Sequence, residues 1–532
     1  AGNPLNALPT VPLPPTQAQV PLQVTPPQNQ LQETLSRTLL VTRVDVQGVS
    51  AIPFEDVATL LQPLSGQTRS LAELLAVAEK ITALYQARGY ALSFAYLPPQ
   101  DFAGGVVRVQ VVEGFIQRLE LEGDFGKSEA LIREMAAPLL AEKPLTSATF
   151  QKQTQLMTRL PGIEITANAN LPTTTDGATP LILRAKHKPI LVSVGGEMRK
   201  PATRFIASLL LNDPLWQGSQ VQLSTLLKNP DQERFLSAGL TQMLNASGTT
   251  ARVAYTDYRS RNDPLSHVEG IDDVTEQRKL DIGVTHPWVI SSTEQLSTTV
   301  GMYGVNYRKG YLVQSSQLAI SDAEKIRALY AQLAWARSQG TMAQSASVFF
   351  AQGLRAMGAG LARSNSAGAA MDTNPADLGF TRISVDYAQR HRFANKLGAA
   401  FAVGGQYSPD VLPASERTSF GGTRFGRGYA AGEFAGDSGF GASAELNYQW
   451  AMDTRWLKSV EPYVMFEYAK TTQQQAGMAS SLLRSTTVGL RLADNKHYAV
   501  DLSASKPMGD RSFRNPDRKL RYGLLLTYNL DM

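Results

Sequence analysis

Hydrophobic and polar residues follow two different patterns along this chain of 532 residues. Up to about residue 188, helical spacing of apolar residues alternates with short strand-like segments. After residue 188 the helical spacing disappears and apolar and polar residues alternate every second position, regularly in residues 380–387 and less regularly in residues 461–468. Such alternation is typical of strands with one apolar and one polar face. The pattern therefore predicts a mixed α and β part followed by a long all-β part.

The mixed part repeats one order of elements. The predicted order is strand, helix, helix, strand, strand, over residues 38–46, 53–61, 70–87, 91–97 and 106–113. The same order follows over residues 116–121, 127–140, 146–159, 163–169 and 180–187. An internal repeat of this kind indicates two successive domains of one fold. We expect two α+β domains of βααββ order, at residues 38–114 and 115–188.

The first 37 residues have a different composition, with eight prolines. Proline lacks the amide donor and is excluded from helix interiors. We expect residues 1–37 to form an extended or disordered tether, and the pattern is compatible with a short helix over residues 28–37.

The long all-β part, residues 189–532, contains sixteen strand candidates of about ten residues each, the length of a tilted bilayer crossing. Short connections at residues 214–219, 451–458 and 494–496 contrast with long ones at residues 262–277, 359–378 and 408–439. No apolar run approaches the roughly 20 residues of a membrane-spanning helix, and only a closed barrel leaves no strand edge unpaired in lipid. The pattern predicts a sixteen-stranded antiparallel membrane β-barrel with a polar lumen. A large soluble β domain is the alternative.

Composition and charge exclude several classes of function. The chain has no cysteine, which rules out thiol catalysis, thiolate metal sites and disulfides. The net charge is only +5 and lysines and arginines form no cluster, so we expect no nucleic-acid partner. The five histidines have no ligand-like spacing, and no nucleophile, base and orienting group can be assembled. We expect no metal, no cofactor and no enzymatic activity.

A distinctive hairpin carries a family resemblance. Between two predicted strands stands Tyr96-Leu97-Pro98-Pro99-Gln100-Asp101, followed by Phe102 and two glycines, a connection fixed by proline and relieved by glycine. This segment, through Gly114, and the preceding helix end at residues 85–90 resemble the first POTRA domain of two-partner secretion transporters of the haemolysin-activator type. Their superfamily also contains the barrel-assembly insertase. The resemblance extends over residues 39–532.

A second glycine-rich segment, residues 420–429, could be mistaken for a dinucleotide fingerprint, but no βαβ unit surrounds it. It resembles the family's Arg-Gly-aromatic motif, here Arg427, Gly428 and Tyr429. The resemblance implies that this motif lies at the tip of an extracellular loop, residues 408–439, which joins strands eleven and twelve and folds back into the barrel. A solvated loop arginine is the alternative.

The same resemblance implies an acidic partner for Arg427 on the next crossing but one. Glu467 stands where the family has aspartate, and Ala469 replaces the family's glycine. The guanidinium of arginine is a planar, permanently charged fork. We expect Arg427 to pair with the Glu467 carboxylate and so to fix the loop.

The C-terminal segment, residues 521–528, resembles the signal by which final barrel strands are selected for assembly. Gly523, Leu526 and Tyr528 carry this resemblance, although the usual terminal aromatic residue is absent. An ordinary edge strand is the alternative.

The resemblance implies a transporter of the Gram-negative outer membrane whose POTRA domains lie in the periplasm. These domains would capture a large unfolded exoprotein, which would then pass through the lumen without ATP. Further expected partners are outer-membrane lipids and, during biogenesis, the barrel-assembly machinery. Many family members have an N-terminal plug helix, and the prolines here predict a reduced or absent plug. An outer-membrane assembly insertase of the same superfamily is the alternative, and the hairpin at Tyr96 favours secretion.

Overall fold

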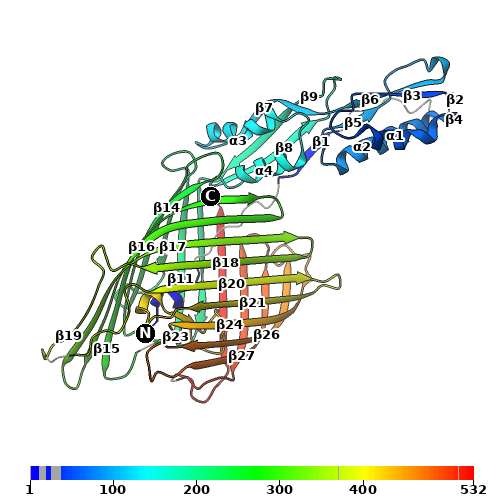
Figure 1. Cartoon of the computed structure of the whole chain (residues 1–532). Coiled ribbons are helices and arrows are strands. Elements are labelled where there is room, and N and C mark those ends of the chain that lie inside the picture. The colour runs from blue at the N-terminus through cyan, green and yellow to red at the C-terminus, as the bar shows by residue number, and fades with distance from the viewer. Residues whose placement is uncertain are drawn as a thin grey trace. The chain divides into compact units, whose positions relative to one another are not determined.

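A computed structural model describes residues 2–10, 20–25, 37–265, 267–368, 371–512 and 514–531 (Figure 1). The chain forms two compact units. One consists of residues 16–187 with 290–292, and the other contains the remaining residues, including the N-terminal segment up to residue 15. The helix considered for residues 28–37 lies outside the described residues, except for residue 37.

The first unit begins with a domain that has the predicted strand and helix order, with one additional short strand, β4, between its two helices. Its helices pack on a sheet of order β3-β6-β5, in which β3 and β6 are parallel. The elements are β2 (Thr38–Val41), β3 (Arg43–Gln47), α1 (Phe54–Leu61), β4 (Gln67–Ser70), α2 (Leu71–Ala87), β5 (Phe94–Tyr96) and β6 (Val106–Val112). Helix α2 starts at a capping box, in which Ser70 and Glu73 satisfy each other's main-chain N–H groups. Thr42 divides the single strand predicted for residues 38–46, because its N–H donates to the Gly105 carbonyl oxygen.

The second domain repeats this order with β7 (Phe115–Gly123), α3 (Glu129–Ala141), α4 (Ser147–Met157), β8 (Ile163–Asn170) and β9 (Ala178–His187). Its sheet has the order β1-β8-β9-β7. The added strand β1 (Leu22–Thr25) belongs to the segment predicted as a tether and pairs in parallel with β8 from Ala167 to Asn170. These residues are extended, as predicted, but they belong to a sheet and do not form a free tether. An extended segment with free amide groups can complete an open sheet edge, which its composition does not reveal.

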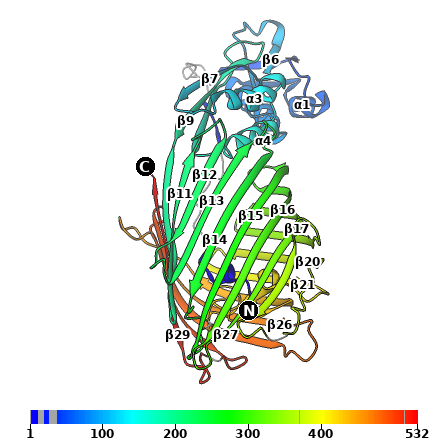
Figure 2. The ribbon, with the colours of Figure 1, turned by 90° about the vertical axis from the view of Figure 1, so that its left-hand side faces the viewer.

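The second unit is a closed antiparallel barrel, as the alternation of residues predicted (Figures 1 and 2). Strands β19 and β25 share the positions of β18 and β24, which leaves sixteen positions around the wall. The final strand closes on the first through pairs from Leu191–Asp531 to Met198–Leu524. The strands are β10 (Ile190–Arg199), β11 (Ala202–Asn212), β12 (Ser219–Leu226), β13 (Glu233–Met243), β14 (Thr250–Arg261), β15 (Ile271–Ile290), β16 (Glu294–Val313), β17 (Leu318–Gln339), β18 (Met342–Gly353), β19 (Gly360–Asn365), β20 (Thr381–Arg392), β21 (Leu397–Tyr407), β24 (Ser438–Tyr448), β25 (Trp450–Ala451), β26 (Ser459–Thr472), β27 (Ser481–Ala493), β28 (Tyr498–Pro507) and β29 (Arg521–Asp531).

The two faces of the barrel wall differ as expected for a membrane protein. On β14, Ala254 and Tyr258 are buried on the lumen side, whereas Val253 and Tyr255 are exposed on the outer side. Buried ion pairs, such as Arg204 with Glu233 at 2.8 Å, occupy the lumen. Among the described residues, no helix is both long enough and apolar enough to cross a membrane.

Three neighbouring strands, β15, β16 and β17, are about twice as long as predicted, with 20 to 22 residues each. Residues 271–277, predicted as loop, belong to β15. This stretch contains acidic and amide side chains on both faces, as in Asp272, Asp273 and Glu276, so it lacks the apolar face used to recognise a strand. Pairing with neighbouring strands extends β15 beyond the apolar stretch of the wall.

The N-terminal segment occupies the barrel lumen. Residues Pro4–Ala7 form a short 3-10 helix, capped by the Asn3 side chain. Leu5 and Leu8 pack against an apolar patch of the inner wall formed by Ile206, Leu226, Phe235 and Tyr258. The amide of Asn3 donates to the Ser415 carbonyl oxygen at 2.8 Å. The tether prediction is wrong here, because the prolines exclude a long helix without excluding a compact turn held by the lumen wall.

Candidate functional site

A loop between β21 and β24, the eleventh and twelfth positions of the wall, folds back into the lumen over residues 408–437. This loop contains η4 (Ala414–Glu416) and a hairpin of β22 (Thr418–Phe420) and β23 (Phe434–Gly436). The predicted loop was two residues longer, because Ser438 and Gly439 belong to β24. The hairpin needs Gly421, which has φ of 115° and whose missing Cβ leaves space for the carbonyl oxygen of Ala430.

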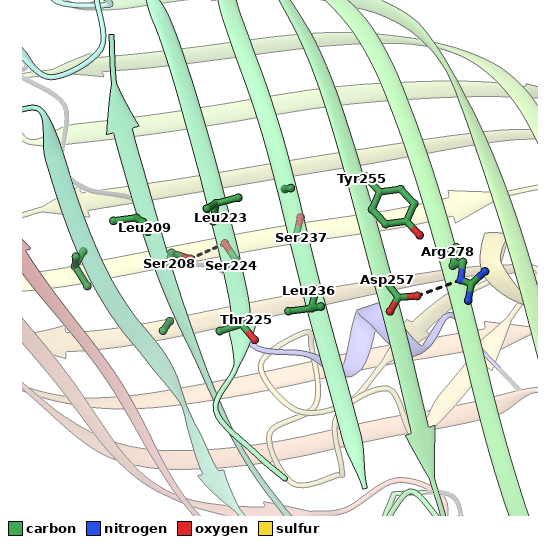
Figure 3. A pocket seen from close by; sticks show the side chains of 13 residues that line it. Ser208, Leu209, Leu223, Ser224, Thr225, Leu236, Ser237, Tyr255, Asp257 and Arg278 are labelled. Atoms are coloured by element: carbon green, nitrogen blue, oxygen red, sulfur yellow. Dashed lines mark hydrogen bonds and ion pairs between the residues drawn. The ribbon is translucent and has the colours of Figure 1, made fainter. Parts of the chain in front are cut away.

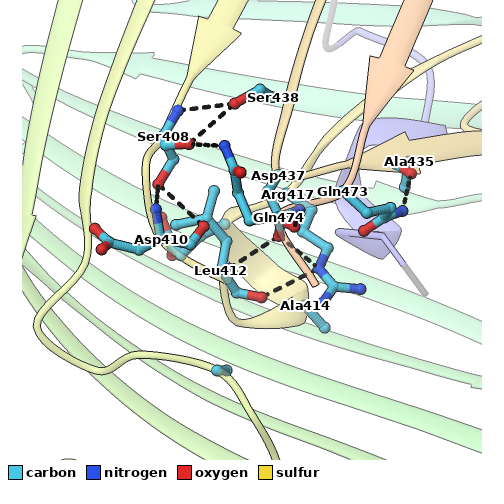
Figure 4. A network of polar contacts seen from close by, with 12 residues as sticks. Ser408, Asp410, Leu412, Ala414, Arg417, Ala435, Asp437, Ser438, Gln473 and Gln474 are labelled. Atoms are coloured by element: carbon cyan, nitrogen blue, oxygen red, sulfur yellow. Dashed lines mark hydrogen bonds and ion pairs between the residues drawn. The ribbon is translucent and has the colours of Figure 1, made fainter. Parts of the chain in front are cut away.

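The base of the loop is fixed by one buried carboxylate (Figure 4). The Asp437 side chain accepts hydrogen bonds from the N–H groups of Leu412 and Gln474, at 2.9 and 2.8 Å. Its Oδ1 also lies 3.2 Å from Nε of Arg417. The Ser408 N–H donates to Oγ of Ser438 at the two ends of the loop. These contacts join the two ends of the loop to each other.

A second set of contacts ties the loop base to other strands of the wall. Glu416 accepts hydrogen bonds from Nε of Arg382 at 2.9 Å and from the Tyr303 hydroxyl at 2.6 Å. Glu324 accepts from the N–H of Ala414 at 2.8 Å. The loop is thus attached to β16, β17 and β20 through polar side chains. In the described residues, it shares no sheet with the wall.

At the loop tip, Arg427 reaches β26 and β28. Its Nη1 donates to the Tyr463 hydroxyl at 2.6 Å and to Oδ2 of Asp501 at 3.0 Å. The Tyr463 hydroxyl in turn donates to Oδ1 of Asp501 at 2.7 Å, which closes a triangle of three groups. The guanidinium also lies over the Tyr463 ring, 5.5 Å from its centroid.

The expected pairing of the Arg427 guanidinium with Glu467 is not what the structure contains. Glu467 Oε2 accepts from the main-chain N–H of Arg427 at 2.8 Å and from the Ser485 hydroxyl at 2.6 Å. Glu467 lies beneath the loop backbone, so its carboxylate meets the N–H while the long arginine side chain extends past it to Asp501. The two predicted residues are in contact, but a second acid carries the ion pair.

Sequence reasoning missed three residues of this site: Tyr463, Asp501 and Arg199. Asp501, Ser503 and Ser505 alternate with apolar residues on β28, a pattern that marks a lumen face and could have indicated a candidate acid. Arg199, on the first wall strand β10, is 5% exposed and donates from Nη1 to the main-chain carbonyl oxygen of Arg427. Arg199 comes near the loop tip only because the barrel closes, and the sequence of β10 alone does not indicate this proximity.

Gly428 and Tyr429 complete the tip. A Cβ on Gly428 would lie 2.8 Å from the main-chain nitrogen of Pro507, so the motif glycine permits close contact with the wall. The Tyr429 hydroxyl accepts from the N–H of Gly509 at 2.8 Å and donates to the Asp510 carbonyl oxygen at 3.2 Å. Tyr429 and Ala469 share a buried apolar cluster with Phe420 and Leu483. The tip is therefore fully engaged with the inner wall.

The hairpin motif that begins at Tyr96 joins β5 and β6. Gln100 continues the strand pairing with its side chain, which donates to the Arg108 carbonyl oxygen at 2.9 Å and accepts from the Arg108 N–H at 2.8 Å. Asp101 accepts from the N–H of Ala103 at 3.1 Å. Leu97 and Phe102 pack on the domain core. Tyr96 ends β5, and Pro98 and Pro99 follow it in the turn.

The end of the same motif carries a perturbed carboxylate. Glu113 accepts hydrogen bonds from the N–H groups of Ser50 and Ala51 and from the Tyr85 hydroxyl, each at 2.7 Å. Burial by itself would raise the pKa of Glu113, but these hydrogen bonds outweigh it and hold the pKa below its ordinary value. Glu113 thus joins the hairpin to α2 and to the segment before α1.

The proposed assembly residues lie on the closing strand β29. Gly523 lies opposite Ser503 of β28, and Leu526 and Tyr528 lie opposite Gly196 and Val194 of β10. Leu526 and Tyr528 therefore lie in the register that closes the barrel, and Gly523 lies one residue before its last pair, Met198–Leu524. Their recognition during assembly stays a prediction.

Comparisons with known proteins agree with this architecture. The model of the ShlB-type POTRA domain matches residues 39–114, and that of the haemolysin secretion/activation proteins ShlB/FhaC/HecB matches residues 281–492. The heme/hemopexin transporter protein HuxB of Haemophilus influenzae (strain 86-028NP) is 21% identical over 87% of this chain and 82% of its own length. The outer membrane transporter CdiB of Escherichia coli O6:K15:H31 (strain 536 / UPEC) is 33% identical over 19% of this chain and 18% of its own length. The structure of CdiB from Escherichia coli superimposes with a TM-score of 0.63 at 19% identity, covering 94% of this chain and 93% of CdiB, which shows a common fold.

Proposed function

Because the chain belongs to the two-partner secretion transporters of the outer membrane, we propose that it captures an unfolded exoprotein through its POTRA domains and passes it through the barrel lumen. In this proposal, transport does not use nucleotide hydrolysis. Folding of the exoprotein outside the cell makes transport unidirectional. The cargo is a polypeptide secreted through this barrel, in line with the family.

The observation that carries the proposal is the way in which the lumen is filled. Two segments, residues 2–10 and the loop of residues 408–437, lie inside the barrel and are held by side-chain contacts. Neither segment is a strand of the wall, so both can leave without opening the sheet. A polar lumen then offers an unfolded chain hydrogen-bonding partners in place of water.

In this proposal, capture at the POTRA domains uses the sheet edge formed by β8. An extended peptide gains main-chain hydrogen bonds when it joins a sheet as an additional strand. The β8 edge of the second domain already holds Leu22–Thr25 in this manner. We expect the exoprotein to take the place of β1 on β8, which would exchange an internal strand for an incoming one.

The loop contacts can be tested directly. Glu467→Ala removes the acceptor of the Arg427 N–H and of the Ser485 hydroxyl, so we expect the loop to lose its position and secretion to fall. The amount of exoprotein in the medium or on the cell surface is compared with wild type. Heat-modifiable mobility of the barrel on gels establishes that the variant is folded, and full secretion by a folded Glu467→Ala variant would contradict the proposal.

A further inference from the structure

The outer wall has an apolar groove over strands β11 to β14 (Figure 3). Its volume is about 670 Å³. Two adjacent rows of paired residues form its floor and sides. One row runs Ala207–Thr225–Leu236–Asp257–Arg278 and the next runs Leu209–Leu223–Ala238–Tyr255.

The groove faces lipid and not the lumen. Along β11 and β12, Ser208 and Ser224 are buried on the inner side and share a hydrogen bond of 2.7 Å, whereas their neighbours Leu209 and Leu223 point outward. Small side chains at Ala207 and Ala238 lie between bulkier outward neighbours, so the wall is hollowed there. An apolar hollow on this side of a membrane barrel is in contact with lipid chains.

One end of the groove is charged. Asp257 Oδ2 lies 2.6 Å from Nη2 of Arg234, and its Oδ1 accepts from Nε of Arg278 at 3.2 Å (Figure 3 shows the second pair). The Asp257 side chain is 14% exposed and that of Arg278 is 64% exposed. Within the described ranges, Nη1 and Nη2 of Arg278 have no hydrogen-bond partner. Two arginines on one aspartate leave an excess positive charge that points outward.

The charged end lies toward the outer leaflet. The 408–437 loop and the long 354–380 connection mark the extracellular rim, because long connections of bacterial barrels are extracellular. From Asp257, β14 runs toward that same rim, where it ends at Arg261. The next outward pair in this direction, Arg259 with Glu276 at 3.3 Å, continues the charged surface. The outward side chains thus change from apolar to arginine at the level where the acyl chains of the outer leaflet end and its headgroups begin.

We propose that this face binds a phosphorylated, acylated glycolipid of the outer leaflet. Acyl chains lie in the groove against Leu209, Leu223 and Tyr255, and a phosphate accepts hydrogen bonds from Arg278 and Arg234. The arginine fork matches phosphate oxygens in geometry as well as in charge. Asp257 holds both guanidinium groups in place before the lipid arrives, which lowers the ordering cost of binding. The site does not depend on the proposed transport function.

The test uses the full-length protein in detergent, titrated with bisphosphorylated lipid A and with the same lipid after dephosphorylation. Native mass spectrometry measures the bound fraction. Arg234→Gln with Arg278→Gln removes both donors and keeps the groove, and we expect the preference for the phosphorylated lipid to fall about tenfold, as for the loss of hydrogen bonds to a charged group. Arg484→Gln is the matched control, because Arg484 is another exposed arginine on the outer wall, on β27, away from the groove.

A second variant tests the apolar part. Ala207→Trp fills the groove without changing charge, and we expect weaker binding of both lipids, whereas Ala444→Trp, at an exposed position of β24, leaves binding unchanged. The proposal would be overturned if the wild type bound both lipids equally, or if Arg484→Gln lowered the preference for the phosphorylated lipid as much as the double variant does. Either result would mean that the lipid is bound only as nonspecific annular lipid. Competition by inorganic phosphate alone, with no effect of Ala207→Trp, would also overturn the proposal. If the double variant fails to fold by heat-modifiable mobility, Arg278→Gln alone serves, since that side chain is largely exposed.

Discussion

The hairpin after Tyr96 and the loop tip at Arg427 are both short glycine-containing motifs, but they are held by different contacts. The hairpin is fixed within its own domain, through the Gln100–Arg108 pair, the domain core and the hydrogen bond from the Thr42 N–H to Gly105. The loop tip is fixed by wall residues 36 to 228 positions away, through side chains that pair with it from β10, β26 and β28. The first motif stabilises one domain, whereas the second holds in the lumen a loop whose two strands form a sheet separate from the wall. This contrast predicts that substitutions in the hairpin lower stability and that substitutions at the tip alter transport in a folded protein.

The largest effect on the stability of a domain is expected from Gly105→Val in the hairpin. Gly105 has φ of 70°, and a side chain there would collide with the Leu40 carbonyl oxygen and with Thr42. Backbone strain and overpacking together lower the free energy of unfolding of this domain by about 3 kcal/mol. Hydrogen exchange of the β6 amides in the full-length protein measures the loss.

The matched control for that variant is Gly104→Ala. Gly104 has a similar φ of 66°, but no atom lies within 4 Å of its missing Cβ. We expect a cost of only about 1 kcal/mol from the left-handed conformation. Equal exchange rates in the two variants would show that the collision with β2 has no part in the effect.

At the loop tip, we expect Asp501→Asn to leave the barrel folded and to lower secretion. Arg427 then loses its ion pair and keeps a neutral acceptor, which weakens the attachment of the loop by about 2 kcal/mol. Secreted exoprotein and the conductance of the barrel in planar bilayers are the two readouts. Asp386→Asn is the control, because this exposed aspartate lies 4.0 Å from Arg424 of the same loop and is expected to have little effect.

The N-terminal segment is a second part of the chain that lies in the lumen without belonging to the wall. Leu5→Asp with Leu8→Asp places two carboxylates against the apolar patch at Ile206 and Phe235. Burying unpaired charge there costs several kcal/mol, so the segment leaves the lumen. We expect higher conductance with an unchanged barrel fold, and unaltered conductance would mean that residues 2–10 do not restrict the pore.

The smallest effect is a pH dependence of the first POTRA domain. The pKa of Glu113 is lowered in the folded domain, so its contribution to stability is complete above the ordinary value of 4.5. This contribution is lost as the pH falls through the lower pKa of the folded state. Hydrogen exchange in β6 from pH 7 to pH 3 measures it. Glu113→Gln is expected to remove this part of the pH dependence, and an unchanged profile would assign it to other groups.

The sequence was informative wherever structure depends on neighbouring residues. Alternation on strands such as residues 380–387 and the three-four spacing of α2 predicted the barrel and both βααββ domains, because these patterns follow from which side of an element is apolar. The length of β15 escaped prediction, since residues such as Asp272 leave the bilayer and lose the apolar face. The placement of Leu5 escaped it too, since its partners come from strands more than 200 residues away.

The candidate site was predictable only in part for the same reason. Arg427 and Glu467 were selected through a resemblance, and the structure brings them together. The ion pair to Asp501 could not be assigned, because several acids face the lumen. Which of them meets Arg427 depends on how far the loop tip reaches into the lumen, and this distance is set by the closed barrel and not by any one strand.

The Arg199 side chain connects the tip of the loop to the first strand of the barrel. This guanidinium lies on the first strand, next to the line of closure with β29, and its one hydrogen bond among the described residues goes to the Arg427 carbonyl oxygen. If the loop withdraws, the buried Arg199 guanidinium beside that line loses its acceptor, and the β10–β29 junction is weakened. Coupling between two equilibria is reciprocal. Strain that loosens the junction therefore lowers the free energy of loop withdrawal by the same amount.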